Sequence, residues 1–123
     1  MAARERDHRR PMGALENQVL DYLWQAEEPV TPRDVRDGLD LDVAYSTVLT
    51  ILTRLWKKGL TEREQRGRVY VYRPKVDEAD YVAGAMRREL ARARDHSAVL
   101  SRFVGTLPKG ELRLLRDLLD EGP

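Results

Sequence analysis

Residues 44–59 read AYSTVLTILTRLWKKG, and the spacing of apolar residues in this stretch decides the fold. Laid out at about 100° per residue, its large apolar side chains fall on one side of a helix: Val48, Ile51, Leu52 and Leu55. The opposite side holds Ser46, Thr50, Thr53 and Lys57, flanked by Thr47 and Arg54. Gly59 can adopt the left-handed backbone that ends a helix, and Leu60 can supply the apolar contact that follows. We therefore predict a helix over residues 44–58 with one face in a core.

Two further helices are predicted upstream of this one. Over residues 14–26, apolar side chains repeat at intervals of three and four, which is typical of one buried helical face. Thr31 can cap a second, short helix, Pro32 fits its first position and Asp34 suits its positive end. This short helix runs to about Leu39, and the polar connection DLDV follows.

Downstream, residues 61–73 (TEREQRGRVYVYR) change from a helical period to a strand period. Valine alternates with tyrosine over residues 69–72, and the glycine within 65–68 permits a tight turn. A two-stranded hairpin that ends at Pro74 fits this pattern. The order helix, short helix, helix, hairpin is that of a winged helix-turn-helix, in which the third helix enters the major groove and the hairpin is the wing.

Three short amphipathic helices are predicted beyond residue 76. Asp77 can cap the first, and the apolar stripes run through residues 82–93, 99–104 and 112–119. The predicted fold class is therefore mainly α with a small β-hairpin. Its expected domains are a disordered arm (1–12), a winged helix DNA-binding domain (13–75) and a helical dimerisation domain (76–123).

The composition excludes several classes of function. The 123 residues include no cysteine, which rules out thiolate zinc sites and thiol nucleophiles. His8 and His96 lie in no recognisable motif, and no glycine-rich phosphate loop occurs, so we expect no enzyme activity, no metal and no cofactor. No apolar run approaches the roughly 18–20 residues of a membrane span, and the N-terminus lacks the apolar segment of a signal peptide. We expect a cytoplasmic protein without membrane insertion.

The net charge of +1 conceals an uneven distribution along the chain. Residues 1–42 carry six basic and ten acidic side chains, residues 43–75 carry eight and two, and residues 76–123 carry eight and nine. The middle block therefore has a net charge of +6. Such a block favours a polyanionic partner such as double-stranded DNA, although a solvated basic face has the same composition.

The outer face of the predicted helix 44–58 carries the side chains that a groove-reading helix needs. Ser46, Thr47 and Thr50 lie in its first turn and a half, where side chains reach base edges. Tyr45 and Leu49 are further candidates for base contacts, with ordinary packing as the alternative. The cations predicted to bind phosphates are Arg54, Lys57 and Lys58 on the helix and Arg66 and Arg68 at the wing tip.

A simpler interpretation is that the hydroxyl side chains are merely solvated. Serine and threonine have mediocre helix propensity, however, and Glu, Lys or Ala would serve better at positions that are only exposed. Tyr70 and Tyr72 are predicted to be core or hinge aromatics rather than base-stacking groups, and Trp24 and Trp56 to be packing residues.

Sequence stretches along nearly the whole chain resemble one known family. They are LENQVLDYLW (15–24), PVTPRDVRDGL (29–39), AYSTVLTILTRLWKKGLTERE (44–64), RVYVYRP (68–74) and FVGTLPKGELRLLRDLL (103–119). In these stretches the chain resembles the penicillinase-repressor and methicillin-resistance-repressor family, which also includes copper-responsive relatives. The segment TVLTILTRLWKKGL is the most specific of them.

The resemblance implies a homodimer on a palindromic DNA operator, with antibiotic-resistance or related genes under its control. The residues agree, because three short helices cannot bury one apolar stripe each within about 45 residues unless something covers them, and a second copy is the simplest cover. The interface candidates, each of which could instead belong to an intrachain core, are Val82, Ala85, Met86, Leu100, Phe103, Leu115 and Leu118.

Two properties of the family do not carry over unchanged. The resemblance implies induction by a sensor-linked protease that cuts an asparagine–phenylalanine bond, but the matching pair here is Arg102-Phe103. The copper-responsive branch carries cysteine ligands near its C-terminus, and because this chain has no cysteine, copper sensing by that route is excluded.

The predicted function is therefore sequence-specific repression by a dimer without a ligand pocket of its own. Two alternatives stay open. One is a winged helix that serves as a protein-interaction module, which the +6 block disfavours. The other is a DNA-binding protein that activates genes or organises chromosomes without a specific operator.

Overall fold

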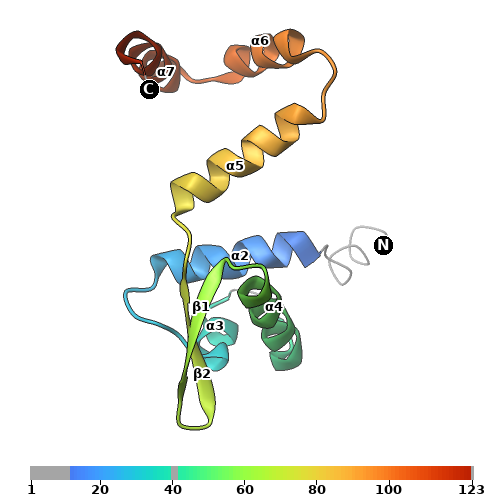
Figure 1. Ribbon diagram of the computed structural model, residues 1–123, viewed down its shortest axis with the longest axis vertical. Coiled ribbons are helices and arrows are strands. Elements are labelled where there is room, and N and C mark those ends of the chain that lie inside the picture. Colours follow the sequence, from blue (N-terminus) through green and yellow to red (C-terminus); the bar gives the residue numbers. More distant parts are fainter. Residues whose placement is uncertain (1–11, 40–41, 123) are drawn as a thin grey trace. The chain divides into compact units, whose positions relative to one another are not determined.

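The computed structural model describes residues 12–39 and 42–122, and Figure 1 traces their course. As predicted, the chain is mainly helical with one antiparallel hairpin. Its elements are α2 (Met12–Gln25), α3 (Pro32–Gly38), α4 (Tyr45–Lys57), β1 (Thr61–Arg66), β2 (Val69–Pro74), α5 (Glu78–Ala91), α6 (His96–Thr106) and α7 (Lys109–Glu121). They form an N-terminal unit that ends at Glu78 and a C-terminal unit that begins at Ala79.

Two sequence predictions fall partly outside the described residues. The predicted arm covers residues 1–12, of which only Met12 is described, and Met12 is the first residue of α2 rather than part of an arm. Asp40 and Leu41 of the predicted connection also lie outside the described residues.

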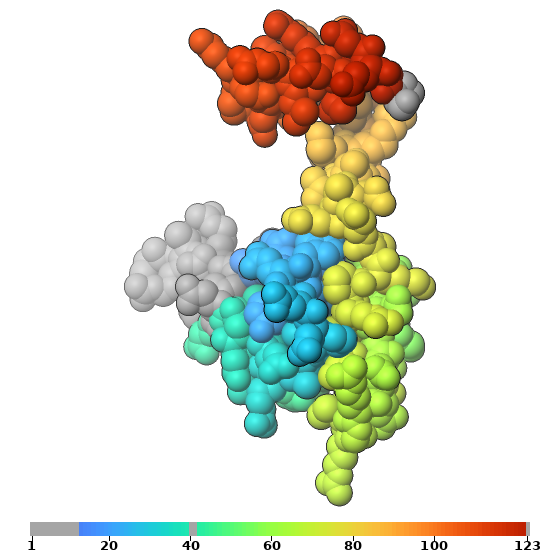
Figure 2. Space-filling model, turned by 90° about the vertical axis from the view of Figure 1, so that its left-hand side faces the viewer, coloured from blue at the N-terminus to red at the C-terminus, as the bar shows by residue number. Residues whose placement is uncertain are grey.

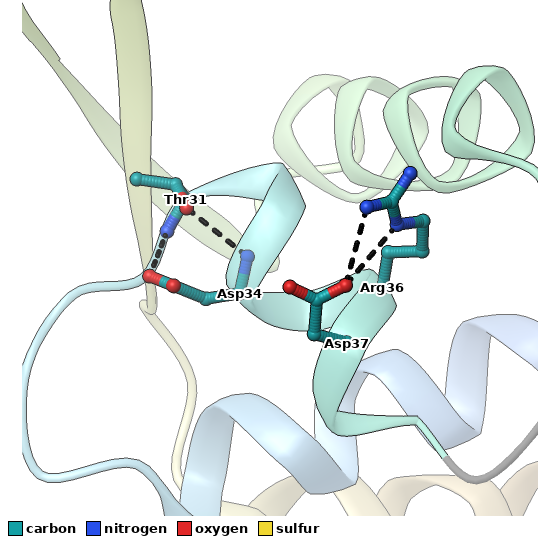
Figure 3. A network of polar contacts seen from close by, with 4 residues as sticks. All are labelled: Thr31, Asp34, Arg36 and Asp37. Carbon is teal, nitrogen blue, oxygen red and sulfur yellow. Dashed lines mark hydrogen bonds and ion pairs between the residues drawn. The ribbon is translucent and has the colours of Figure 1, made fainter.

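Thr31 caps α3, as the sequence predicts, and with Asp34 it forms a capping box. The Thr31 hydroxyl accepts a hydrogen bond from the Asp34 backbone N–H at 3.1 Å, and the Thr31 N–H donates to Asp34 Oδ2 at 3.0 Å (Figure 3). Pro32 occupies the first turn, where its missing N–H costs no helical bond. One turn later, Arg36 bonds to Asp37 in an exposed ion pair that stabilises the helix little (Figure 3).

Helix α4 ends where the sequence predicts, at a glycine with left-handed backbone. Gly59 has φ of 80°. Its N–H donates to the Trp56 carbonyl at 3.0 Å, and the Leu60 N–H reaches back to the Leu55 carbonyl at 2.9 Å. This pair of bonds is the Schellman motif, which satisfies carbonyls that the helix end would otherwise leave unpaired.

The hairpin packs along the helices of the N-terminal unit and extends beyond them (Figure 2). Strands β1 and β2 pair antiparallel, with Thr61 opposite Pro74 and Arg66 opposite Val69. Gly67, with φ of 66°, makes the tight turn. On the other edge of β2, Val30 and Tyr72 exchange backbone hydrogen bonds of 2.9 and 2.7 Å, so the segment before α3 acts as a short third strand.

The core of the N-terminal unit lies between its three helices and the inner face of the hairpin. Helix α2 contacts α3, α4 and β2, and α4 contacts α3 and β1. The buried apolar side chains are Val19, Leu20, Leu23, Val30, Val35, Val48, Ile51, Leu52, Leu55, Val71 and Tyr72. Trp24 Nε1 donates to the Val76 carbonyl at 3.1 Å, which ties the end of the hairpin to α2. Three helices and a wing around one core are the winged helix arrangement.

The C-terminal unit consists of α5, α6 and α7, which pack only sparsely on one another. Asp95 caps α6 by accepting a hydrogen bond from the Ala98 N–H at 3.0 Å, a cap that the sequence analysis did not identify. None of the side chains described in these three helices is buried. Across the described part of the chain, no helix is long and apolar enough to cross a membrane.

Gly38, the last residue of α3, lets this helix approach α2 closely. A Cβ at this position would lie 2.6 Å from Cζ and 2.8 Å from Oη of Tyr22. Because alanine would otherwise favour the helix by about 1 kcal/mol, packing and propensity oppose each other here. The overlap with a half-buried ring is the larger effect, since overpacking typically costs about 1–3 kcal/mol.

We predict that Gly38→Ala lowers the free energy of unfolding by roughly 1–2 kcal/mol in urea titrations followed by circular dichroism. Gly13→Ala is the matched control, because a Cβ on Gly13 meets nothing within 4 Å. In a Tyr22→Leu background, Gly38→Ala should no longer destabilise. Equal stability of Gly38→Ala and the parent would show that Tyr22 does not restrict this position.

Candidate nucleic-acid interface

The outward face of α4 carries the predicted hydroxyl side chains. Ser46 and Thr50 are exposed, and Thr47 is half-buried. Thr50 Oγ1 donates a hydrogen bond to the Ser46 backbone carbonyl at 3.0 Å. The hydroxyl proton of Thr50 is therefore engaged within the helix, and its lone pairs and methyl group remain for an outside partner. A base edge opposite Thr50 matches this side chain if it offers a hydrogen-bond donor or a methyl group.

Tyr45 and Leu49 lie beside these hydroxyls at the start of α4. Their side chains are 38% and 36% exposed, so neither is taken up by the core. The guanidinium carbon of Arg36 lies 5.9 Å from the centre of the Tyr45 ring, a contact between α3 and α4. Both residues have free surface for a base contact, and that role stays a prediction.

The cations at the C-terminal end of α4 divide into two kinds. Arg54 and Lys57 belong to the last turn and are exposed. Lys58 instead lies against α2, where its Nζ donates to Glu16 Oε1 at 2.9 Å and Oε2 at 3.2 Å. The Glu16 side chain is only 10% exposed, so Lys58 neutralises a nearly buried carboxylate. A phosphate contact by Lys58 stays a prediction, and it competes with this ion pair.

The wing tip presents Arg66 and Arg68 on either side of Gly67, and both arginines are exposed. Arg66 Nη2 lies 3.2 Å from Glu64 Oε1. Both side chains of this pair are more than half exposed, and such pairs contribute at most about 1 kcal/mol. Arg66 can therefore exchange this carboxylate for another anion at small cost.

A cation between two aromatic rings links α4 to the wing. The guanidinium carbon of Arg63 lies 3.6 Å from the centre of the Trp56 ring and 4.0 Å from that of Tyr70. Tyr72 is buried in the core, whereas Tyr70 is 37% exposed and meets Tyr72 edge-on. Arg63 was not among the residues predicted from the sequence. The hairpin register, which places residues 63 and 70 diagonally on one face, is the signal that could have found it.

The predicted interface residues and the predicted cleavage bond all lie in the C-terminal unit. Met86, Leu100 and Phe103 line a cavity of about 690 Å³ between α5 and α6. The bond between Arg102 and Phe103 lies inside α6. Six of the seven interface candidates are exposed: Val82, Ala85, Met86, Leu100, Phe103 and Leu118. The seventh, Leu115, is half-buried.

The exposed hydroxyls and cations of the N-terminal unit suit an extended polyanion. Helix α4, with its outward hydroxyls and cations, contacts β1 of the hairpin. The tip of this hairpin, which carries Arg66 and Arg68, projects from the unit (Figure 2). Among the described residues, no group of His, Asp or Glu side chains lies close enough to hold a metal ion. An exposed helix with hydroxyl and cationic side chains is of the kind that enters the major groove of DNA.

Comparison with known proteins gives one family. The family profile described as Penicillinase repressor matches residues 12–121. The Transcriptional regulator BlaI of Mycobacterium tuberculosis is 39% identical over 115 residues, covering 89% of this chain and 83% of that protein. The Penicillinase repressor of Bacillus licheniformis is 30% identical over 104 residues, covering 83% of this chain and 73% of that protein.

Among solved structures, the solution structure of the DNA binding domain of the repressor BlaI is similar to this chain. It shares 34% sequence identity, with a TM-score of 0.48, and the match covers 54% of this chain and 82% of that one.

We predict that Lys58→Ala destabilises the N-terminal unit, because it leaves the Glu16 carboxylate without its counter-charge. The expected loss is roughly 1–3 kcal/mol, less than for a fully buried pair because Lys58 is half exposed. Lys57→Ala, one residue away, is the control and should stay within about 0.5 kcal/mol of the parent.

Adding Glu16→Gln to the Lys58→Ala variant should recover most of this loss, since a neutral amide needs no cation. Thermal and urea unfolding of the four proteins measure both effects. If Lys58→Ala and Lys57→Ala unfold alike, the ion pair does not hold α2 to α4.

Proposed function

The chain belongs to the penicillinase repressor family, and from this we propose that it is a transcriptional repressor that binds a palindromic DNA operator as a homodimer. The relatives named above are a transcriptional regulator and a repressor, so DNA-binding regulation is the common ground. The single observation that carries the proposal is the division of α4 into a buried apolar face and an outward face of hydroxyls and cations.

We assign sequence preference to the start of α4 and affinity to the cations around it. The proposed base contacts are Ser46, Thr47, Thr50, Tyr45 and Leu49. The proposed phosphate contacts are Arg54 and Lys57 on α4 and Arg66 and Arg68 on the wing, which fix the register of the helix in the groove. Lys58 is a further proposed phosphate contact, and there the phosphate competes with the Glu16 carboxylate for the same charge.

We propose residues 13–75 as the DNA-binding domain and residues 76–123 as the dimerisation domain. The support is that the described side chains of α5, α6 and α7 include none that is buried in the single chain. A second copy supplies matching apolar stripes, and an interface between identical chains is most often two-fold symmetric. Two symmetric reading helices then require a palindromic operator.

For release from DNA, we propose cleavage at the Arg102–Phe103 bond by a sensor-linked protease. The bond lies within α6, and the Phe103 carbonyl accepts a hydrogen bond from the Thr106 hydroxyl at 2.6 Å. A protease that binds extended backbone requires α6 to unwind locally. Because α6 has no buried side chain, that opening costs little free energy. The family name further suggests an antibiotic-resistance gene among the targets.

We predict that selection from a random pool of duplexes returns a two-fold symmetric sequence. Thr50→Ala should then reduce the preference for this sequence over a random duplex by roughly ten-fold, with the salt dependence unchanged. Arg54→Ala should weaken binding to both duplexes and lower the slope of log K against log salt by about 0.9 per protomer.

Fluorescence anisotropy titrations at several NaCl concentrations provide these quantities. A selected motif without symmetry would contradict the dimeric operator. A parent protein whose DNA affinity is independent of salt would favour a protein-interaction module instead.

We predict that the parent chain, of 14.2 kDa, sediments as a dimer and that Phe103→Glu dissociates it. A charge placed in an apolar interface should raise the dissociation constant roughly a hundred-fold or more. Ser101→Glu is the control, since Ser101 lies on the side of α6 away from the apolar stripe. Monomeric parent protein at micromolar concentration, or equal effects of the two substitutions, would contradict this interface.

A further inference from the structure

The guanidinium of Arg63 contacts two aromatic rings that come from different elements. Trp56 belongs to α4 and Tyr70 to β2, while Arg63 itself lies on β1. Its guanidinium carbon is within 3.6 and 4.0 Å of the two ring centres. At these distances both rings contact the cation, and cation–π attraction restrains it.

The hydrogen-bond donors of this cation have no partner in the part of the chain that the structure describes. A guanidinium carries five N–H donors in its plane, and stacking on its faces leaves them available. Among the described residues, the guanidinium of Arg63 has no hydrogen-bond acceptor and no ion-pair partner, whereas Arg66 and Arg73 on the same hairpin each pair with a glutamate. These glutamates, Glu64 and Glu62, alternate with Arg63 and lie on the other face of the hairpin.

Arg63 lies between α4 and the wing tip, which are the two parts of the unit proposed to contact DNA. Trp56 lies about two to three helical turns beyond the hydroxyl side chains at the start of α4. Tyr70 lies next to the wing tip. A duplex with α4 in its major groove and the wing on its backbone would run past Arg63, because Arg63 lies between these two elements.

We propose that Arg63 binds a backbone phosphate of DNA, and that Trp56 and Tyr70 hold its guanidinium in the orientation that this requires. This inference rests on the proposed function, and it adds one phosphate contact, made by Arg63, between α4 and the wing. The free protein already restrains the side chain, so little rotamer freedom is lost on binding. Arginine suits the position better than lysine, because only a planar cation both stacks and offers a fork of donors to phosphate.

The test compares Arg63→Gln with Arg73→Gln in binding to a labelled random-sequence duplex across a series of NaCl concentrations. Both substitutions remove one positive charge from the hairpin, but Arg73 is paired with Glu62 on the opposite face. Arg63→Gln should lower the slope of log K against log salt by about 0.9 per protomer and weaken binding roughly ten-fold at low salt. Arg73→Gln should leave the slope as in the parent.

Two further variants separate the charge of Arg63 from its support. Arg63→Lys keeps a phosphate-binding charge without the stacked fork, so it should bind more weakly with the slope of the parent. Trp56→Leu removes one ring and should give the same result. If Arg63→Gln is too unstable to assay, Arg63→Met keeps the apolar stem between the rings and replaces it in the comparison.

A folded Arg63→Gln variant with the parent's slope of log K against log salt would overturn the inference. If that variant also melts at a lower temperature than the parent, the contact of Arg63 with the two rings has a structural role only. The proposed function fails separately, if the parent and Arg54→Ala show no salt-dependent binding to duplex DNA at all. A normal Arg54→Ala result beside an unchanged Arg63→Gln slope would therefore reject the role of Arg63 alone.

Discussion

Burial of the apolar face of α4 is the constraint on which the rest of the N-terminal unit depends. Val48, Ile51, Leu52 and Leu55 have no exposed surface, and burial of each such side chain contributes about 1.5–3 kcal/mol relative to water. Rotating the helix by one residue, about 100°, would expose part of this set and bury hydroxyls in its place. The core therefore decides which side chains of α4 face outward, and Gly59 decides where the chain turns into the wing.

The positively charged side chains of residues 43–75 make different kinds of contact, which the net charge of the segment does not reveal. Lys58 neutralises a carboxylate of α2, and Arg66 and Arg73 lie beside glutamates of the hairpin. Arg63 is fixed between aromatic rings, and Arg54 projects from α4. The summed field attracts a polyanion from a distance, while these local contacts decide which cations are free to meet it.

The sequence predicted those features that depend on residues close in the chain. The bounds of α4 follow from apolar periodicity and Gly59, and the start of α3 follows from Thr31 and its neighbours. The missed contacts join distant segments. Glu16 and Lys58 are 42 positions apart, and the place of Arg63 depends on how the hairpin folds against α4. For the candidate site, the sequence thus identified the outward face of one helix but not which cations were already engaged.

With the proposed dimer, the exposed apolar side chains of the C-terminal unit would make the lifetime of each chain depend on its concentration. Because none of the described side chains of α5, α6 and α7 is buried, these helices open at little cost in the single chain. Housekeeping proteases degrade a protein in proportion to the population of such open forms. A partner copy that binds only the closed form lowers this population by mass action. For a chain that dimerises as proposed, dilution during rapid growth would shorten its lifetime, so its level would be set by turnover as well as by synthesis.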